Sequence, residues 1–119
     1  MGDLVRLPVT FFLRRFKSLL TTGSIVWIDR DKNRVGLAAI GFTKRNALDE
    51  IMRLDVDDYC RGLGRDDKGR PWDVWEFGRI INGIEVYIKL SIKETGLGQG
   101  VIISFHPAEF KLWFPFKEG

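Results

Sequence analysis

Three side chains that could do acid–base or phosphate chemistry are predicted to share one face of a β-sheet. Tyr87 and Lys89 lie in a run of alternating apolar and polar residues, and this alternation directs both away from the apolar side. The only histidine, His106, ends a second β-rich run. It joins Tyr87 and Lys89 if Ile103 and Phe105 of that run face the core. An imidazole, a phenol and an ammonium group would then lie together on the open face.

Such a set of groups suits RNA cleavage without a metal. The reaction needs a base for the 2′-hydroxyl proton, cations on the scissile phosphate, an acid for the leaving 5′-oxygen and a flat surface for an unstacked base. His106 is the candidate acid or base because imidazole titrates near neutrality. Tyr87 and Lys89 are candidates to bind phosphate. The residues expected to bind RNA are cations of the preceding loop and two tryptophans, namely Arg65, Lys68, Arg70, Trp72 and Trp75.

The same residues allow an ordinary structural interpretation. Tyrosine and lysine are typical of the solvated face of any sheet, and a histidine before Pro107 often ends a strand without a catalytic role. A non-catalytic module that binds nucleic acid or a protein through this face is therefore an alternative to the enzyme. Substitution of His106 or Tyr87 should abolish cleavage only in an enzyme. A small-molecule binder is a third alternative and would require a deep pocket.

The sequence predicts neither a metal site nor a cofactor site. Asp55, Asp57 and Asp58 resemble the start of a calcium loop, but the later ligands and the glycine are missing. One cysteine and one histidine are too few for the common structural zinc sites, which use four such ligands. Cys60 has no neighbour in the sequence that would activate a thiol, so a partly buried structural role is expected.

The first half of the chain is predicted to be mainly helical. Polar N-cap residues precede stretches that carry apolar residues at helical spacing. These caps are Thr10, Asp31 and Thr43, and the helices that follow them run over residues 11–20, to about residue 40, and over 44–54. A β-rich run at 24–28 predicts a short strand, and residues 55–59 predict one further helical turn.

The second half changes to the period of two that is typical of strands. Strands are predicted over 72–81, 84–93 and 101–106, and Asn82-Gly83 predicts a type I′ turn between the first two. Helices followed by strands predict an α+β fold, with N-terminal helices packed on one face of a C-terminal antiparallel sheet. With 119 residues and no linker or repeat, the chain is predicted to form a single domain over 1–119.

Composition and charge narrow the class of protein further. Hydrophobic residues make up 45% and charged residues 29%, which is typical of a globular protein. The net charge of +3 mildly favours an acidic or nucleic-acid partner. Apolar runs are too short to cross a membrane, no secretory signal is visible, and one cysteine allows no internal disulfide. We therefore expect a cytoplasmic protein that does not associate with a membrane.

Short motifs between Lys44 and His106 carry a family resemblance over about half the chain. In order, they are Arg45-Asn46-Ala47-Leu48, Tyr59, Gly62-Leu63, Asp66-Asp67, Trp72-Asp73-Val74-Trp75, Val86-Tyr87-Ile88-Lys89 and Val101-Ile102-Ile103-Ser104-Phe105-His106. This pattern resembles the MqsR family of RelE-like toxins, which are bacterial mRNA interferases neutralised by a cognate antitoxin.

The resemblance implies a RelE-like endoribonuclease of a type II toxin–antitoxin system, with metal-independent cleavage on the exposed concave face of the sheet. Its partners would be a cognate antitoxin and mRNA, with ribosomes engaged in related toxins; whether the chain forms a homodimer is left open. Tyr87 matches the family's strand tyrosine, and Lys68 falls near its loop lysine. His106 replaces a lysine of the family and preserves a proton-carrying group. Trp72 replaces a glutamine that some members carry, which is a departure at a position linked to base contact.

The tail from Pro107 to Gly119 extends beyond this pattern. It is too apolar to be left in water, because five large hydrophobic residues crowd it. These are Phe110, Leu112, Trp113, Phe114 and Phe116. We expect the tail either to fold back on the domain or to help bind the antitoxin.

Overall fold

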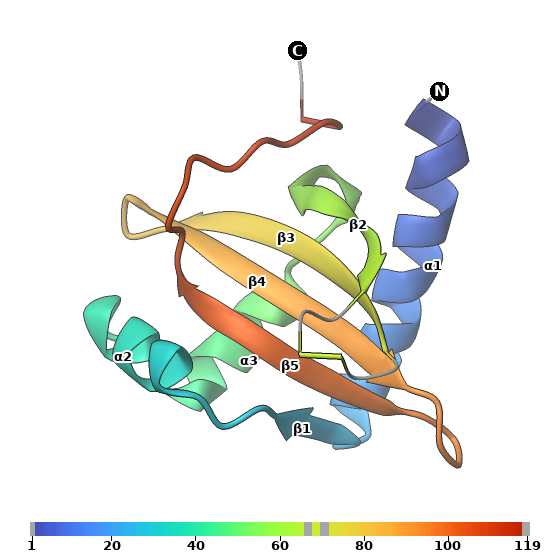
Figure 1. The fold of residues 1–119 in the computed structure, drawn as a ribbon, viewed down its shortest axis with the longest axis horizontal. Helices are drawn as coiled ribbons and strands as arrows, with labels where there is room; N and C mark the ends of the chain where they lie inside the picture. The colour runs from blue at the N-terminus through green and yellow to red at the C-terminus, as the bar shows by residue number, and fades with distance from the viewer. Residues whose placement is uncertain (1, 66–67, 70–71, 118–119) are drawn as a thin grey trace.

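The computed structural model describes residues 2–65, 68–69 and 72–117, with side chains from residue 6 onward. Within these ranges, helices come first and most of the strands follow, as expected for an α+β fold (Figure 1). The elements are α1 (Gly2–Thr21), β1 (Ile25–Trp27), α2 (Asp31–Ala39), α3 (Lys44–Met52), the 3-10 helix η1 (Val56–Asp58), β2 (Tyr59–Arg65), β3 (Asp73–Ile81), β4 (Ile84–Lys93) and β5 (Gln99–Pro107).

The five described strands form one mixed sheet in the order β1-β5-β4-β3-β2. Neighbouring strands from β2 to β5 are antiparallel, whereas β1 runs parallel to β5. The C-terminal strands therefore form the predicted antiparallel sheet, and the N-terminal strand β1 adds a parallel edge whose place in the sheet was not predicted. β1 comes from the helical half of the chain, and strand direction depends on how the chain returns to the sheet, which a local pattern does not encode.

Helices α1 and α3 cover one face of the sheet, α2 lies along the β5 edge, and the opposite face is toward the viewer in Figure 1. The buried side chains of α1 repeat at helical spacing, with Val9, Leu13 and Phe16 pointing to the sheet. From the sheet, alternate residues such as Phe77 and Ile88 meet them. Burial of this apolar surface is the main force that holds the helices on the sheet.

Of the three predicted N-caps, one is confirmed and two are wrong. Thr43 is the N-cap of α3, and its side chain and that of Asn46 form a reciprocal capping box. Thr10 does not cap a helix, because α1 already begins at Gly2, eight residues before it. Inside the helix, the Thr10 hydroxyl donates to the Arg6 carbonyl. Asp31 is the first residue of α2 rather than its cap.

The hairpin between β3 and β4 is confirmed. Asn82 and Gly83 both have positive φ angles, of 52° and 78°, as a type I′ turn requires. Strand β2 was not predicted, because Gly62 and Gly64 suggested a break. Gly62 has a φ of 132°, and a Cβ there would lie 2.8 Å from the Val74 carbonyl oxygen, so only glycine lets β2 approach β3 so closely.

Strand β5 contains a bulge that changes which residues face the core. Lys89 pairs with Ser104, but Leu90 pairs with Ile102, so Ile103 is the extra residue. Ile102 therefore joins the helix-side core together with Phe105, while Ile103 joins a separate small cluster on the opposite face. The prediction that Ile103 faces the core beside Phe105 was wrong, since strict alternation fails at a bulge.

The tail folds back on the structure, which confirms one of the two expectations for it. After β5 it runs past the ends of β4 and β3 and reaches the neighbourhood of β2 and α1 (Figure 1). Leu112 and Phe114 pack over Gly78 of β3, and the ring of Phe116 stacks on Tyr59 at 5.2 Å. Of the helices in the described ranges, none is long and apolar enough to cross a membrane.

Candidate functional site

A cleft of about 440 Å³ opens on the face of the sheet that the helices leave uncovered. Its floor comes from β3, β4 and β5, and one wall comes from the tail. The side chains predicted to do chemistry, Tyr87, Lys89 and His106, line this cleft. It is also lined by four cations that were not predicted, a serine and two glutamates, namely Arg30, Lys32, Arg61, Lys111, Ser104, Glu76 and Glu109.

The structure brings Tyr87, Lys89 and His106 together. Tyr87 and His106 are directly opposite each other on β4 and β5, and their ring centres lie 5.4 Å apart. Lys89 lies two residues from Tyr87 on the same side of β4, opposite Ser104. Lys89 and His106 are only 8% and 7% exposed, so both side chains are largely shielded from bulk water. Electrostatic interactions at this position are stronger than on an open surface.

A backbone hydrogen bond orients the His106 ring. Its Nδ1 atom lies 2.9 Å from the carbonyl oxygen of Pro107. Because a carbonyl oxygen can only accept, Nδ1 must carry a proton and donate it. In the neutral ring, Nε2 then holds the free lone pair. The ring is therefore arranged to accept a proton at Nε2.

Helix α2 positions His106 through an unusually close approach to β5. A Cβ added to Gly36 would lie 2.4 Å from the Cβ of His106, so only glycine allows this packing. The buried Asn33 side chain accepts a hydrogen bond from the backbone N–H of Phe105 at 2.9 Å and donates to the carbonyl of Ile103 at 3.0 Å. Asn33 thus takes the place of a neighbouring strand beside the bulge, just before His106.

These two residues were absent from the predicted site, although one signal pointed to Gly36. A glycine inside a helix lowers helix stability by about 1 kcal/mol relative to alanine, so it suggests a packing requirement. No comparable signal exists for Asn33, because its partners on β5 lie about seventy residues away along the chain.

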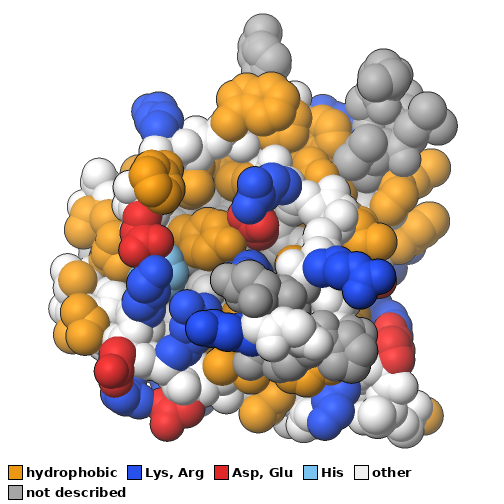
Figure 2. Space-filling view, viewed as in Figure 1, with side chains coloured by type: hydrophobic (Ala, Val, Ile, Leu, Met, Phe, Trp, Pro, Cys, Tyr) orange, Lys and Arg blue, Asp and Glu red, His pale blue; other side chains and the backbone are white. Residues whose placement is uncertain are grey.

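Positive charge in the cleft comes mainly from residues that the sequence did not place there. The Arg30 guanidinium donates to the Ser104 hydroxyl at 3.0 Å, and Arg61 of the unpredicted strand β2 forms an ion pair with Glu76 at 3.1 Å. Lys32 forms an ion pair with Glu109 at 3.0 Å. Figure 2 shows Lys and Arg side chains around the histidine on this face. The cleft lining contains five lysines and arginines against two glutamates, so it favours an anionic ligand.

The ion pairs shift the acidity of groups at the rim of the cleft. The hydrogen bond from Lys32, followed by its charge, lowers the pKa of the Glu109 carboxyl below its ordinary value. The hydrogen bond with Glu76 raises the pKa of the Arg61 guanidinium.

Burial, together with nearby carboxylates, raises the pKa of Cys60 to about 12. The Cys60 thiol therefore stays protonated at neutral pH, as a structural cysteine should.

The predicted RNA-binding residues are distributed differently. Trp75 points to the helix-covered face, where it stacks on Phe12 at 5.2 Å, so the structure does not bring it to the cleft. Trp72 is half-buried on the open face beside the small cluster of Val74, Val101 and Ile103.

The loop cations lie outside the cleft as far as they are described. Arg65 is exposed at the end of β2 and lines a neighbouring cleft together with Arg61. Lys68 is exposed in the loop between β2 and β3. The expectation for Arg70 falls outside the described residues.

In the part of the chain that is described, no group of three or more His, Cys, Asp or Glu side chains could hold a metal ion. The chemistry that the described cleft can perform with its own residues is proton transfer at His106 and stabilisation of negative charge by Lys89 and Arg30.

Comparison with known proteins identifies one family. The model of a family described as "Motility quorum-sensing regulator, toxin of MqsA" matches residues 9–107. No curated protein and no solved structure matches the chain. The matched region includes Tyr87, Lys89 and His106, together with Asn33 and Gly36, and it ends where the tail begins.

Proposed function

The chain belongs to the MqsR toxin family, and from this premise we propose that it is a metal-independent endoribonuclease that cleaves mRNA. It would be the toxin of a type II toxin–antitoxin pair, neutralised by a cognate antitoxin. Its place of action would be the cytoplasm, where it meets mRNA free or on the ribosome. The observation that carries the proposal is the grouping of His106, Tyr87 and Lys89 in one cation-rich cleft.

The first step of the proposed reaction is attack by the 2′-hydroxyl oxygen on the adjacent phosphorus. His106 takes the 2′-hydroxyl proton at Nε2, because its Nδ1 is already committed to the Pro107 carbonyl. The new bond joins the 2′-oxygen to phosphorus, and the bond to the 5′-oxygen breaks. The products are a 2′,3′-cyclic phosphate and a free 5′-hydroxyl.

Two further roles complete the step. Negative charge builds on the phosphate oxygens, and Lys89 and Arg30 are placed in the cleft to stabilise it. In-line attack puts the leaving 5′-oxygen on the far side of phosphorus from the base, so its proton must come from a second group. The Tyr87 phenol is our candidate for that donor, because it lies beside His106 on the neighbouring strand.

Induced expression of matched variants tests the proposal. Wild-type protein should arrest growth and fragment mRNA, whereas His106→Ala should lower cleavage by about 10²–10⁴-fold, the usual contribution of one acid–base group. Leu97→Ala is the control, since Leu97 is 95% exposed in the β4–β5 loop. Circular dichroism should show that both variants keep their fold. Intact mRNA and normal growth with soluble wild-type protein would refute the nuclease.

The alternative is a RelE-like module that binds nucleic acid or protein without cleaving. The cation-rich lining of the cleft supports binding as readily as it supports catalysis. A binding module would retain salt-sensitive RNA binding, which Lys89→Ala would weaken, and no fragments would appear with purified protein and RNA. Fragments that depend on His106 would exclude this alternative.

A further inference from the structure

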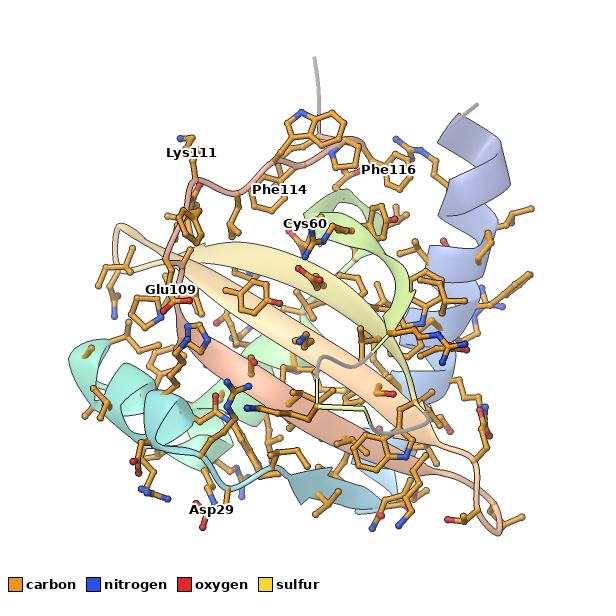
Figure 3. The ribbon with its side chains drawn as sticks, viewed as in Figure 1. Asp29, Cys60, Glu109, Lys111, Phe114 and Phe116 are labelled. Atoms are coloured by element: carbon orange, nitrogen blue, oxygen red, sulfur yellow. The ribbon has the colours of Figure 1, made fainter. Side chains whose placement is uncertain are left out.

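The tail, residues 108–117, forms one wall of the catalytic cleft although it lies outside the region that matches the family. Figure 3 shows Glu109 and Lys111 at its start and Phe114 and Phe116 further along, toward α1. The tail residues that line the cleft run continuously from 108 to 113. This wall is therefore a feature of this chain that the family model does not describe.

Backbone and side-chain contacts hold the tail along its whole length. Near its start, the Ala108 and Leu112 N–H groups donate to the backbone carbonyl and the carboxylate of Glu85, at 2.8 and 3.1 Å. In its middle, Leu112 and Phe114 fill the space above Gly78, where a Cβ would come within 2.4 Å of Leu112.

The far end of the tail also contacts the rest of the protein. Phe116 stacks on Tyr59, and the Arg6 guanidinium lies 4.9 Å from the centre of the Phe116 ring. The Lys117 ammonium lies 3.5 Å from the Asp58 carboxylate. A segment anchored at its start, middle and end holds its remaining side chains in defined positions.

Two aromatic side chains of this anchored segment are left uncovered. Phe110 is 85% exposed and Trp113 is 74% exposed, and both line the cleft that contains His106. Trp113 also lines the neighbouring cleft with Arg61 and Arg65, so it stands between the two. Exposed aromatic rings on a fixed backbone are typical of surfaces that bind a ligand.

We propose that Phe110 and Trp113 stack on unpaired bases of the RNA next to the scissile phosphate. This proposal rests on the proposed nuclease function and adds a base-binding wall to it. Aromatic rings beside cations match single-stranded RNA, whose bases stack on the rings while its phosphates contact the cations. Arg61 lines both clefts and Arg65 lines the neighbouring one, so the cationic path continues past Trp113. The five cations of the cleft favour this ligand over an apolar protein segment.

The test measures binding of a fluorescein-labelled, single-stranded 2′-O-methyl oligonucleotide of about twelve nucleotides, which lacks the attacking hydroxyl. Fluorescence anisotropy compares wild-type protein with Trp113→Ala, Phe110→Ala and Trp113→Phe. Phe11→Ala is the control, because Phe11 is a 58% exposed aromatic residue on α1, outside the cleft. A second probe of the same length with abasic residues separates base stacking from phosphate binding.

We expect Trp113→Ala and Phe110→Ala each to weaken binding of the base-containing probe by about five- to thirty-fold, and Trp113→Phe to restore most of the loss. Affinity for the abasic probe should be the same in all variants. Equal affinity of Trp113→Ala and wild-type protein for the base-containing probe would overturn the stacking wall while leaving the nuclease intact.

Two other outcomes also contradict the wall and are distinguishable from each other. Tighter binding or faster RNA cleavage by Trp113→Ala would show that the tail obstructs the cleft instead of serving it. No binding and no RNA cleavage by wild-type protein would overturn both the wall and the proposed function on which it rests. Circular dichroism of each variant verifies that these exposed substitutions leave the fold unchanged.

Discussion

Replacing Gly36 with alanine should both destabilise the protein and displace its histidine. The added Cβ would lie 2.4 Å from the His106 Cβ, 2.7 Å from its Cα and 3.1 Å from the Phe105 carbonyl oxygen. Favourable contacts between carbon atoms begin at about 3.5 Å, so α2 and β5 must separate by roughly 1 Å. The nearest atoms belong to a strand backbone and a Cβ, which cannot rotate away as the end of a flexible side chain can.

Two opposing effects set the size of this change. Alanine is the better helix former by about 1 kcal/mol, whereas overpacking costs about 1–3 kcal/mol. Because the close contacts involve backbone, we expect the overpacking cost to lie at the high end of its range and the free energy of unfolding to fall by up to about 2 kcal/mol. A misplacement of about 1 Å at a catalytic group reduces activity by about 10²-fold. The cleavage rate should therefore fall far more than the stability loss alone would explain.

Denaturant unfolding and RNA cleavage with purified protein measure the two effects. Val35→Ala is the matched control on the same helix, since Val35 is 68% exposed and alanine improves helix propensity there too. The control should be at least as stable as wild type and fully active. A Gly36→Ala protein as stable and active as wild type would refute the idea that α2 sets the position of His106.

Three further predictions concern stability and reactivity. Asn33→Ala should lower the free energy of unfolding by about 2–4 kcal/mol in denaturant titration, because it leaves a backbone donor and acceptor of β5 unpaired; a loss below about 0.5 kcal/mol would contradict this clamp. The hydrogen bond from Arg15 lowers the pKa of the Glu94 carboxyl in the folded protein. Wild type should therefore have a larger free energy of unfolding than Glu94→Gln above about pH 4.5, and this difference should disappear as the pH falls below the native pKa. Because both side chains are largely exposed, that difference should stay below about 1 kcal/mol at neutral pH, and a difference independent of pH would rule the ion pair out as its cause. With a pKa of about 12, the half-buried Cys60 should react with iodoacetamide at pH 8 much more slowly in the native than in the unfolded protein. Rapid alkylation of the native protein, measured by mass spectrometry, would contradict a protonated thiol.

Elements that depend on neighbouring residues could be predicted from the sequence. The Asn82-Gly83 turn requires two positive φ angles that few other residues adopt, and the Thr43 cap acts on residues three positions away. Alternation along β4 was sufficient to direct Tyr87 and Lys89 to one face, because side chains of a regular strand alternate without regard to the rest of the fold.

Features that join distant segments were decided only by the tertiary structure. The bulge at Ile103 moved that residue to the opposite face, and it is held by Asn33 from another element. Trp75 does not line the predicted site, because its side chain lies on the other face of the sheet, where α1 packs against it. These outcomes depend on packing between elements, and the residues that pack together leave no shared local pattern.

The sequence by itself therefore determined the α+β class, the β3–β4 hairpin and the face that carries Tyr87 and Lys89. His106 joins that face because Phe105, beyond the bulge, faces the core. Only the tertiary structure decided that this face becomes a cleft, because Arg30, strand β2 and the tail reach it through long-range contacts. Backbone propensity and alternation act over a few residues, whereas a cleft needs walls from segments that are far apart in the chain.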